Sequence, residues 1–227
     1  MFLCPVCNEP LIEHSGFAEC IFCHTVEEAE YVCKNKHYVC EDCRLANQHE
    51  IIMRFCSRSK STDPVEMANL IMKHPSFNPY GAEHHELVAP VVLTALRNLN
   101  LAHISESQLN GAMKRGAKIP YGSCGSMGTC GACVSAGVAV AMYGKSNYLK
   151  DTERNATLKT VSNALSKLIG LGGPRCCKYS TYVSIETAWQ VLVSDYNLPL
   201  KPLKLICEFQ DKLKDCKKGK CPLYQKQ

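Results

Sequence analysis

The spacing of apolar residues along the chain predicts a mainly helical protein. Over residues 40–57, Leu45, Ile51, Ile52 and Phe55 recur at the interval that places them on one face of a helix. Alternating apolar and polar residues, which would indicate strands, are scarce. We therefore expect an all-helical body, with short β-hairpins only in the N-terminal region.

Residues typical of helix ends also support a helical body. Asp63 is a predicted N-cap, followed by Pro64 at the first helical position and Glu66 at the third. Further helices are predicted over about residues 83–99, 106–118, 152–170 and 181–196, and Gly172-Gly173-Pro174 separates the last two. Pro90 should kink or divide the first of these four.

Residues 128–144 (GTCGACVSAGVAVAMYG) are small and apolar throughout. We interpret them as a buried helix whose small side chains let neighbouring backbones approach closely, because the segment is too short and too rich in cysteine to span a membrane. No apolar run reaches the roughly 18 to 20 residues that a span needs, and no secretion signal opens the chain. We expect a soluble, cytoplasmic protein that does not contact a membrane.

Three parts follow from these patterns. Residues 1–45 have few periodic apolar residues and many potential metal ligands, as expected for a small zinc-binding β-hairpin module that metal stabilises in place of a core. Residues 46–200 form the predicted helical domain, and residues 201–227 form a short tail that contains cysteine.

The number and spacing of the cysteines indicate the chemistry of the protein. Sixteen cysteines among 227 residues would suit either disulfides or metal. Four C-x-x-C pairs favour metal, because that interval lets two thiolates reach one ion from a tight turn. So many thiols are also typical of a protein from an environment with little oxygen.

The N-terminal ligands predict two tetrahedral zinc sites. They form four ordered pairs: Cys4 and Cys7, Cys20 and Cys23, Cys33 and His37, and Cys40 and Cys43. Sequential pairing would join the first two pairs and the last two, whereas cross-braced pairing joins the first with the third and the second with the fourth. We favour the cross-brace, since CKNKHYVCEDC resembles the middle of RING-type and other treble-clef zinc modules.

A second cysteine group lies in the body. Cys130 and Cys133 share one face of the predicted buried helix, and Cys124 lies in the glycine-rich approach to it. The three thiols fit an iron–sulfur cluster or a reactive thiol site. The alternative is that cysteine and glycine only fill a tight helix contact.

Neighbouring cysteines add further candidates. Cys176 and Cys177 are adjacent, so their side chains diverge in most backbone conformations. They could serve different sites, form a strained vicinal disulfide, or leave one reactive thiol beside Arg175 and Lys178. If they serve different sites, one completes the central group and the other joins Cys207, Cys216 and Cys221. The predicted cofactor-binding residues are therefore Cys124, Cys130, Cys133, Cys176, Cys177, Cys207, Cys216 and Cys221. Cys177 is also a candidate reactive thiol.

His84 and His85, flanked by Glu83 and Glu86, lie at a predicted helix start. Imidazole is a common acid–base group and metal ligand, so both histidines are candidate catalytic residues. The alternative is a role in capping and packing.

The tail is basic. Residues 201–227 contain eight lysines and three acidic residues, a charge of +5 that equals the net charge of the whole chain. Such a tail would attract RNA or an acidic redox protein, unless it is only a solvated surface.

The chain as a whole resembles an uncharacterised cysteine-rich family of anaerobic bacteria and methanogenic archaea. The segments that carry this resemblance are HYVCEDC, TDPVEMANLIMKHPSFNPYGAEHHELVAP, GSCGSMGTCGA, GGPRCCK and the final CEF with Cys216 and Cys221-Pro222. It implies anaerobic metal or sulfur biology but no substrate. Two functions stay open: iron–sulfur redox or sulfur-transfer chemistry at the central cysteines, and a non-catalytic zinc adaptor for a protein or RNA.

Overall fold

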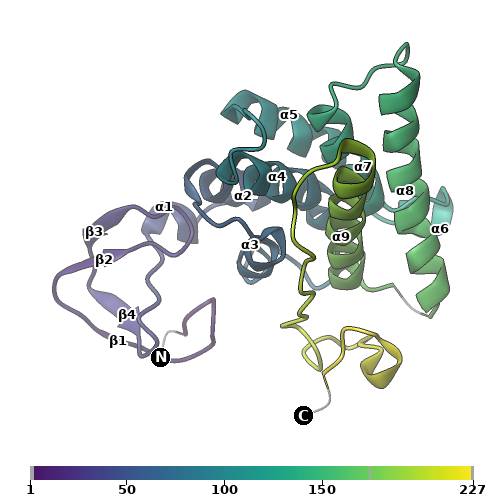
Figure 1. Cartoon of the computed structure of the whole chain (residues 1–227). Helices are drawn as coiled ribbons and strands as arrows, with labels where there is room; N and C mark the ends of the chain where they lie inside the picture. The colour runs from purple at the N-terminus through teal and green to yellow at the C-terminus, as the bar shows by residue number, and fades with distance from the viewer. Residues whose placement is uncertain (1–2, 174, 226–227) are drawn as a thin grey trace.

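The computed structural model describes residues 3–173 and 175–225, and it confirms the mainly helical fold with a small N-terminal β region. Pro174 of the predicted glycine–proline break and Lys226 of the lysine tail lie outside the described residues. In Figure 1 the strands and α1 form a small unit on one side of the helical body, and the tail runs down across α9. None of the helices in the described part combines the length and apolar content needed to cross a bilayer.

The β region consists of two nested antiparallel ribbons. The strands are β1 (Leu11–Glu13), β2 (Phe17–Glu19), β3 (Val26–Glu28) and β4 (Tyr31–Cys33). The inner ribbon pairs β2 with β3, and the outer ribbon pairs β1 with β4, with Leu11 opposite Cys33. These ribbons bring the beginning of the chain next to Cys33, and the predicted confinement of strands to this region is correct.

The single helix predicted over residues 40–57 is wrong. The structure has α1 (Glu41–Arg44) and α2 (Gln48–Arg58), separated by a turn. Asn47 causes the break, because its side chain accepts a hydrogen bond from the Glu50 amide while the Glu50 carboxylate accepts one from the Asn47 amide. Leu45, which we had placed on the buried face, is 69% exposed.

Helix α3 (Pro64–Ile71) begins as predicted. The Asp63 carboxylate accepts hydrogen bonds from the amides of Val65, at 2.8 Å, and Glu66, at 3.3 Å. The later elements are α4 (Glu83–Asn98), α5 (Glu106–Ala117), α6 (Ser123–Ser126), α7 (Gly131–Tyr143), α8 (Asp151–Leu171), α9 (Cys177–Tyr196) and the 3₁₀ turn η1 (Lys218–Lys220).

Pro90 does not divide α4, which continues through it. The amide of Ala89, one residue earlier, donates a hydrogen bond of 3.0 Å to the Ser135 hydroxyl on α7. Burial of α4 against its neighbours keeps the helix continuous, since every residue from Glu83 to Leu96 is buried.

Helix α7 is the centre of the body. It packs against α4, α5, α8 and α9, and its small side chains allow these contacts to be close. A Cβ atom on Gly137 would lie 2.6 Å from the Val161 methyl and 3.3 Å from the Thr157 carbonyl, both on α8. The buried-helix prediction for residues 128–144 is therefore confirmed for the part from Gly131 onward.

The glycine contact gives a first prediction. Gly137→Ala should lower the free energy of unfolding, because the new methyl needs space that Val161 occupies. Gly111→Ala in α5 is the matched control: a Cβ there meets nothing within 4 Å, so it should stabilise the protein by about 0.5–1 kcal/mol. Urea denaturation midpoints would measure both. Equal stabilisation by the two changes would contradict the close packing of α7 on α8.

Candidate metal centres and a cysteine-lined pocket

Two groups of side chains at the N-terminus have the geometry of metal sites. Cys4, Cys7, Cys33 and His37 form one group, and Cys20, Cys23, Cys40 and Cys43 form the other. Within each group the ligand atoms all lie within 4.8 Å of one another. The structure thus joins the first pair with the third and the second with the fourth, which is the cross-braced arrangement.

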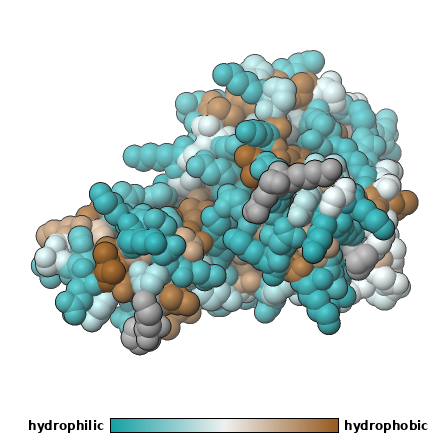
Figure 2. Space-filling model, turned by 90° about the horizontal axis from the view of Figure 1, so that it is seen from below, coloured by the Kyte–Doolittle hydropathy of each residue, from teal (hydrophilic) through white to brown (hydrophobic). Residues whose placement is uncertain are grey.

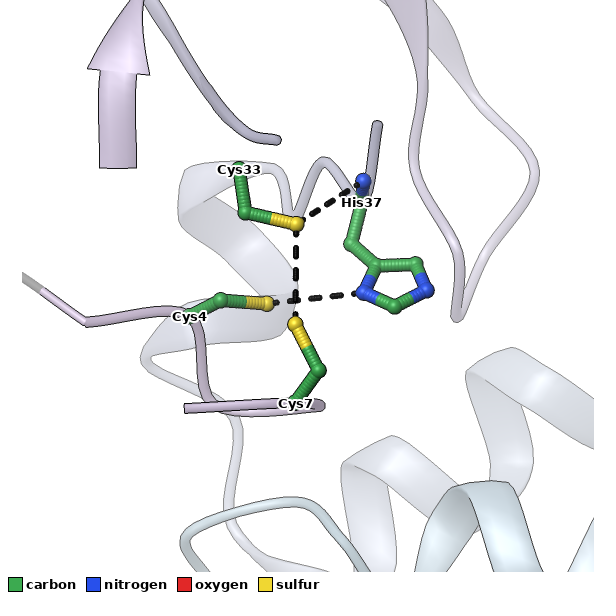
Figure 3. Close-up of side chains that lie close together, drawn as sticks. All are labelled: Cys4, Cys7, Cys33 and His37. Atoms are coloured by element: carbon green, nitrogen blue, oxygen red, sulfur yellow. Dashed lines mark hydrogen bonds between the residues drawn. The ribbon is translucent and has the colours of Figure 1, made fainter. Parts of the chain in front are cut away.

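The distances suit a tetrahedral ion. Bonds of about 2.3 Å from zinc to sulfur put the ligand sulfurs about 3.8 Å apart. The Cys7 and Cys33 sulfurs are 3.7 Å apart, and the Cys4 sulfur lies 3.7 Å from Nδ1 of His37. Figure 3 shows these four side chains converging on one point, with Nδ1 as the nitrogen that faces the sulfurs. In the second group the Cys23 and Cys40 sulfurs are 3.6 Å apart.

Matching turns present the ligands. Asn8 follows Cys7 and His24 follows Cys23, and both have positive φ, 59° and 58°. Their amides donate to the carbonyls of Cys4 and Cys20 at 2.9 and 2.8 Å, which closes each turn and leaves both sulfurs on one side. His24 itself pairs with Glu19 and is not a ligand.

Hydrogen bonds in the second group favour the thiolate form of Cys20. The Cys43 thiol, donating to the Cys20 sulfur, is the main reason that the pKa of Cys20 lies at about 4, even though burial raises it. The Cys40 amide donates to the same sulfur at 3.4 Å. Burial raises the pKa of Cys40, and the hydrogen bond to the Cys20 sulfur raises that of Cys43, so Cys20 is the member of this group that most readily becomes the metal-binding thiolate.

The second group also belongs to the core of the body, while the first does not. Cys20, Cys23, Cys40 and Cys43 are part of the same buried cluster as the helices. His74, after α3, fixes this junction: its Nε2 donates to the Cys43 carbonyl at 2.7 Å, and its ring meets Phe22 edge-on at 5.2 Å. Sequence reasoning missed His74, because a histidine beyond a helix end carries no spacing signal.

The body contains a cavity of about 750 Å³ that several of the predicted cysteines line. Cys124, Cys130, Cys176 and Cys177 all border this central pocket, as do Gly172 and Gly173 at the end of α8. The end of α8 therefore lies beside the beginning of α7, as expected for antiparallel packing. The volume is in the range of small-molecule sites.

Cys130 and Cys133 form a pair at the start of α7. Cys130 is the N-cap residue and borders the pocket, whereas Cys133 is fully buried behind it and accepts a hydrogen bond from the Ser184 hydroxyl at 3.6 Å. Hydrogen bonding from Cys133 lowers the pKa of Cys130 to about 5 and raises that of Cys133 itself. Cys130 is thus a thiolate at neutral pH and Cys133 a thiol.

The two candidate histidines differ in position. His85 borders the pocket, and its Nδ1 donates to the Ile119 carbonyl at 2.9 Å, which leaves Nε2 as an acceptor in the neutral ring. Only glycine fits at position 131, because a Cβ there would lie 2.2 Å from the His85 ring. His84 is fully buried against Phe77, and burial lowers its pKa well below the usual value.

Two cations lie near the cysteines. Arg175 stacks over the rings of Tyr80 and Tyr121, at 5.0 and 5.5 Å, and borders the pocket. Lys178 is only 2% exposed, its ammonium lies 4.6 Å from the ring centre of Phe209, and burial lowers its pKa to about 8. Sequence reasoning did not identify Lys178 as buried, since lysine seldom is.

Among the described residues, only the two N-terminal groups bring three or more ligand atoms within 4.8 Å. The central cysteines share a pocket, but Cys124 is exposed on α6 and Cys133 is buried behind Cys130. An iron–sulfur cluster at the central group therefore stays a prediction. Cys207, Cys216 and Cys221 of the tail do not line this pocket.

Comparison with known proteins places the chain in a family. Residues 52–224 match a family of unknown function, DUF5714. The chain belongs to this family. No curated protein and no solved structure matched the chain. The DUF5714 region contains the central pocket, its cysteines and most of the tail, while both N-terminal metal groups lie outside it.

The cross-brace predicts how paired substitutions change metal content. Cys4→Ser with Cys33→Ser should remove one of two ions, because both residues serve one site, whereas Cys4→Ser with Cys20→Ser should remove both. Sequential pairing would give the reverse. Metal analysis of the purified variants decides between them, with Cys56→Ser, a buried cysteine outside both groups, as the control that should keep both ions.

The two sites should also differ in their effect on stability. Loss of the second site exposes part of the shared core, so Cys20→Ser should destabilise the helical body, whereas Cys4→Ser should leave it nearly unchanged. A loss of about 3 kcal/mol would lower the Tm by roughly 10 °C in a chain of this size. Thermal melting followed at α-helical wavelengths would measure it, and equal melting temperatures for the two variants would contradict the shared core.

Proposed function

We propose that the protein carries out thiol chemistry, redox or sulfur transfer, in the central pocket, and that the N-terminal module holds two structural zinc ions. The observation that supports the first part is the Cys130 and Cys133 pair at the start of α7, with Cys130 bordering a pocket of small-molecule size. The closed geometry of the N-terminal groups supports the second, because structural zinc sites use four protein ligands and leave no open position.

Cys130 is the nucleophile of this proposal. With a disulfide substrate, its sulfur attacks one substrate sulfur, which forms a mixed disulfide and releases the other sulfur as a thiolate. With a persulfide substrate it attacks the outer sulfur, so that Cys130 becomes the persulfide and the rest of the substrate leaves as a thiolate. In the redox case Cys133 then loses its proton and attacks the Cys130 sulfur. This step releases the second substrate thiolate and leaves a disulfide between Cys130 and Cys133, so the substrate gains the two electrons that the cysteines lose.

Other pocket residues have fitting roles. His85 presents Nε2 as a proton acceptor for an incoming thiol or for Cys177 across the pocket. Arg175 and Lys217 supply positive charge at the pocket wall, against a single acid, Asp215. A small anionic sulfur compound suits this lining.

An adaptor function is the second candidate, supported by the surface of the N-terminal module. Leu3, Phe17, Val26 and Tyr31 are each at least half exposed, and Figure 2 shows apolar residues among polar ones on this smaller lobe. Residues 1–45 contain eight acidic and three basic residues, a charge of −5 that disfavours RNA. A protein partner therefore fits the module, whereas RNA or an acidic redox protein would have to bind the lysine tail.

The thiol proposal predicts an unusual pH profile for alkylation. Because the pKa of Cys130 is about 5, its thiolate is already formed at pH 6, and its rate of reaction with iodoacetamide should change little between pH 6 and 8. An ordinary thiol would react roughly tenfold faster per pH unit over the same range. Peptide mapping by mass spectrometry after short pulses would give the rate at each cysteine.

Cys56 is the internal control. It is fully buried, and burial raises its pKa to about 12, so it should stay unmodified at every pH. Cys133→Ala should make the Cys130 rate depend on pH again, since it removes the donor that lowers the pKa. A Cys130 rate that rises tenfold per unit in the unmodified protein would argue against the proposal and leave the adaptor as the better candidate.

A further inference from the structure

A second, smaller cavity lies between α9 and the tail, and four cysteines surround it. Cys176, Cys207, Cys216 and Cys221 all line this tail cavity, whose volume is about 20 Å³. The rest of its wall is mainly apolar or aromatic, including Tyr182 and Phe209. Four cysteines around one space in a protein without disulfides are the usual ligand set of a thiolate metal site.

The chain presents these cysteines from separate directions. Cys176 is the N-cap of α9, with extended backbone, and its sulfur accepts the Tyr179 amide at 3.5 Å. Cys207 follows the extended part of the tail, whereas Cys216 and Cys221 flank η1. An amide that donates to a thiolate stabilises the charged, metal-binding form.

The tail has little regular structure of its own. In the described residues from 201 onward, η1 is the only helical turn and no strand occurs. Single hydrogen bonds join it to the body: the Trp189 indole donates to the Lys201 carbonyl, the Asn69 amide group to the Ile206 carbonyl, and the Asp215 amide to the Tyr80 hydroxyl. An ion pair between Lys73 and Glu208 and apolar contacts of Phe209 with the core of the body add to these bonds. A short segment without a core of its own typically depends on metal or disulfide links.

We propose that Cys176, Cys207, Cys216 and Cys221 form a third metal site, which holds an iron–sulfur cluster and fastens the tail to the body. The spacing of the sulfurs favours a cluster over a single ion. No three of them meet the 4.8 Å spacing that both N-terminal groups show, and the space between them admits a water-sized sphere. A closed zinc site, with sulfurs about 3.8 Å apart, leaves no such space.

The surroundings fit a group of negative charge. Four thiolates around an iron–sulfur core leave a net negative charge, which burial makes unfavourable unless a cation lies nearby. Lys178 supplies this cation. Its side chain is buried, and its ammonium contacts the ring of Phe209, which lines the cavity. No ion pair in the described part of the chain involves Lys178. The wall of the cavity is otherwise mainly apolar and aromatic.

This site is distinct from the proposed thiol chemistry. Cys176 borders both cavities, whereas Cys177 borders only the central pocket and the three tail cysteines border only the tail cavity. The adjacent cysteines therefore serve different sites, and either proposal can fail without the other.

The adjacent cysteines also provide the test. The full chain, purified without oxygen, should contain iron and inorganic sulfide in equal numbers, besides two zinc ions, and should absorb visible light. Cys176→Ser, Cys216→Ser and Cys221→Ser should each lose most of the iron and sulfide. Cys177→Ser and Cys130→Ser are the matched controls and should retain both.

Zinc content and helical circular dichroism show whether each variant is folded, so a loss of iron from a folded variant is informative. Trypsin adds a second measurement: removing iron from the unmodified chain with a chelator should speed cleavage at the tail lysines at least tenfold. Purified protein with two zinc ions and no iron, a third zinc ion in place of iron, or iron lost equally from Cys177→Ser would overturn the proposal.

Discussion

The close approach of neighbouring helices to α7 is the constraint on which the rest of the body depends. Gly131 leaves room for the His85 ring, Gly137 for Val161, and Ser135 meets the backbone of α4. Small side chains gain little from burial individually, but they let four helices pack around one. The same approach places Cys130 at the pocket and buries Cys133, so the packing of α7 also determines which thiol reacts.

The two ends of the chain have little core of their own, and thiols are concentrated there. The strands at the N-terminus are three residues long and largely exposed, and the tail has no regular structure beyond one turn. The N-terminal part contains two groups of four ligands, and the tail brings three cysteines to a cavity that Cys176 of the body also lines. Metal binding at both ends would supply the stability that hydrophobic burial provides only in the middle.

Features that depend on local chemistry could be predicted from the sequence. The Asp63 cap, the cysteine pairs and the small-residue helix each carry a signal within a few residues. Other features depend on contacts between distant residues. The break at Asn47 depends on its reciprocal hydrogen bonds with Glu50, which outweigh the apolar periodicity across residues 40–57. Lys178 is buried because of how α9 packs in the body. His84 is buried whereas His85 borders the central pocket, and this difference depends on the elements that surround α4. No spacing in the sequence indicates either feature.

The start of α9 connects the two proposed sites. Cys176 has the extended backbone of an N-cap, with φ −138° and ψ 100°, while Cys177 begins the helix, so their side chains leave the chain in different directions. Burial raises the pKa of both thiols, to about 11 at Cys177, and the Tyr179 amide, which donates to the Cys176 sulfur, opposes this shift at Cys176. A shift of this one helix end would therefore change the spacing in the tail cavity and in the central pocket together. A change at the proposed metal site could therefore reach the proposed thiol site through the start of α9 alone.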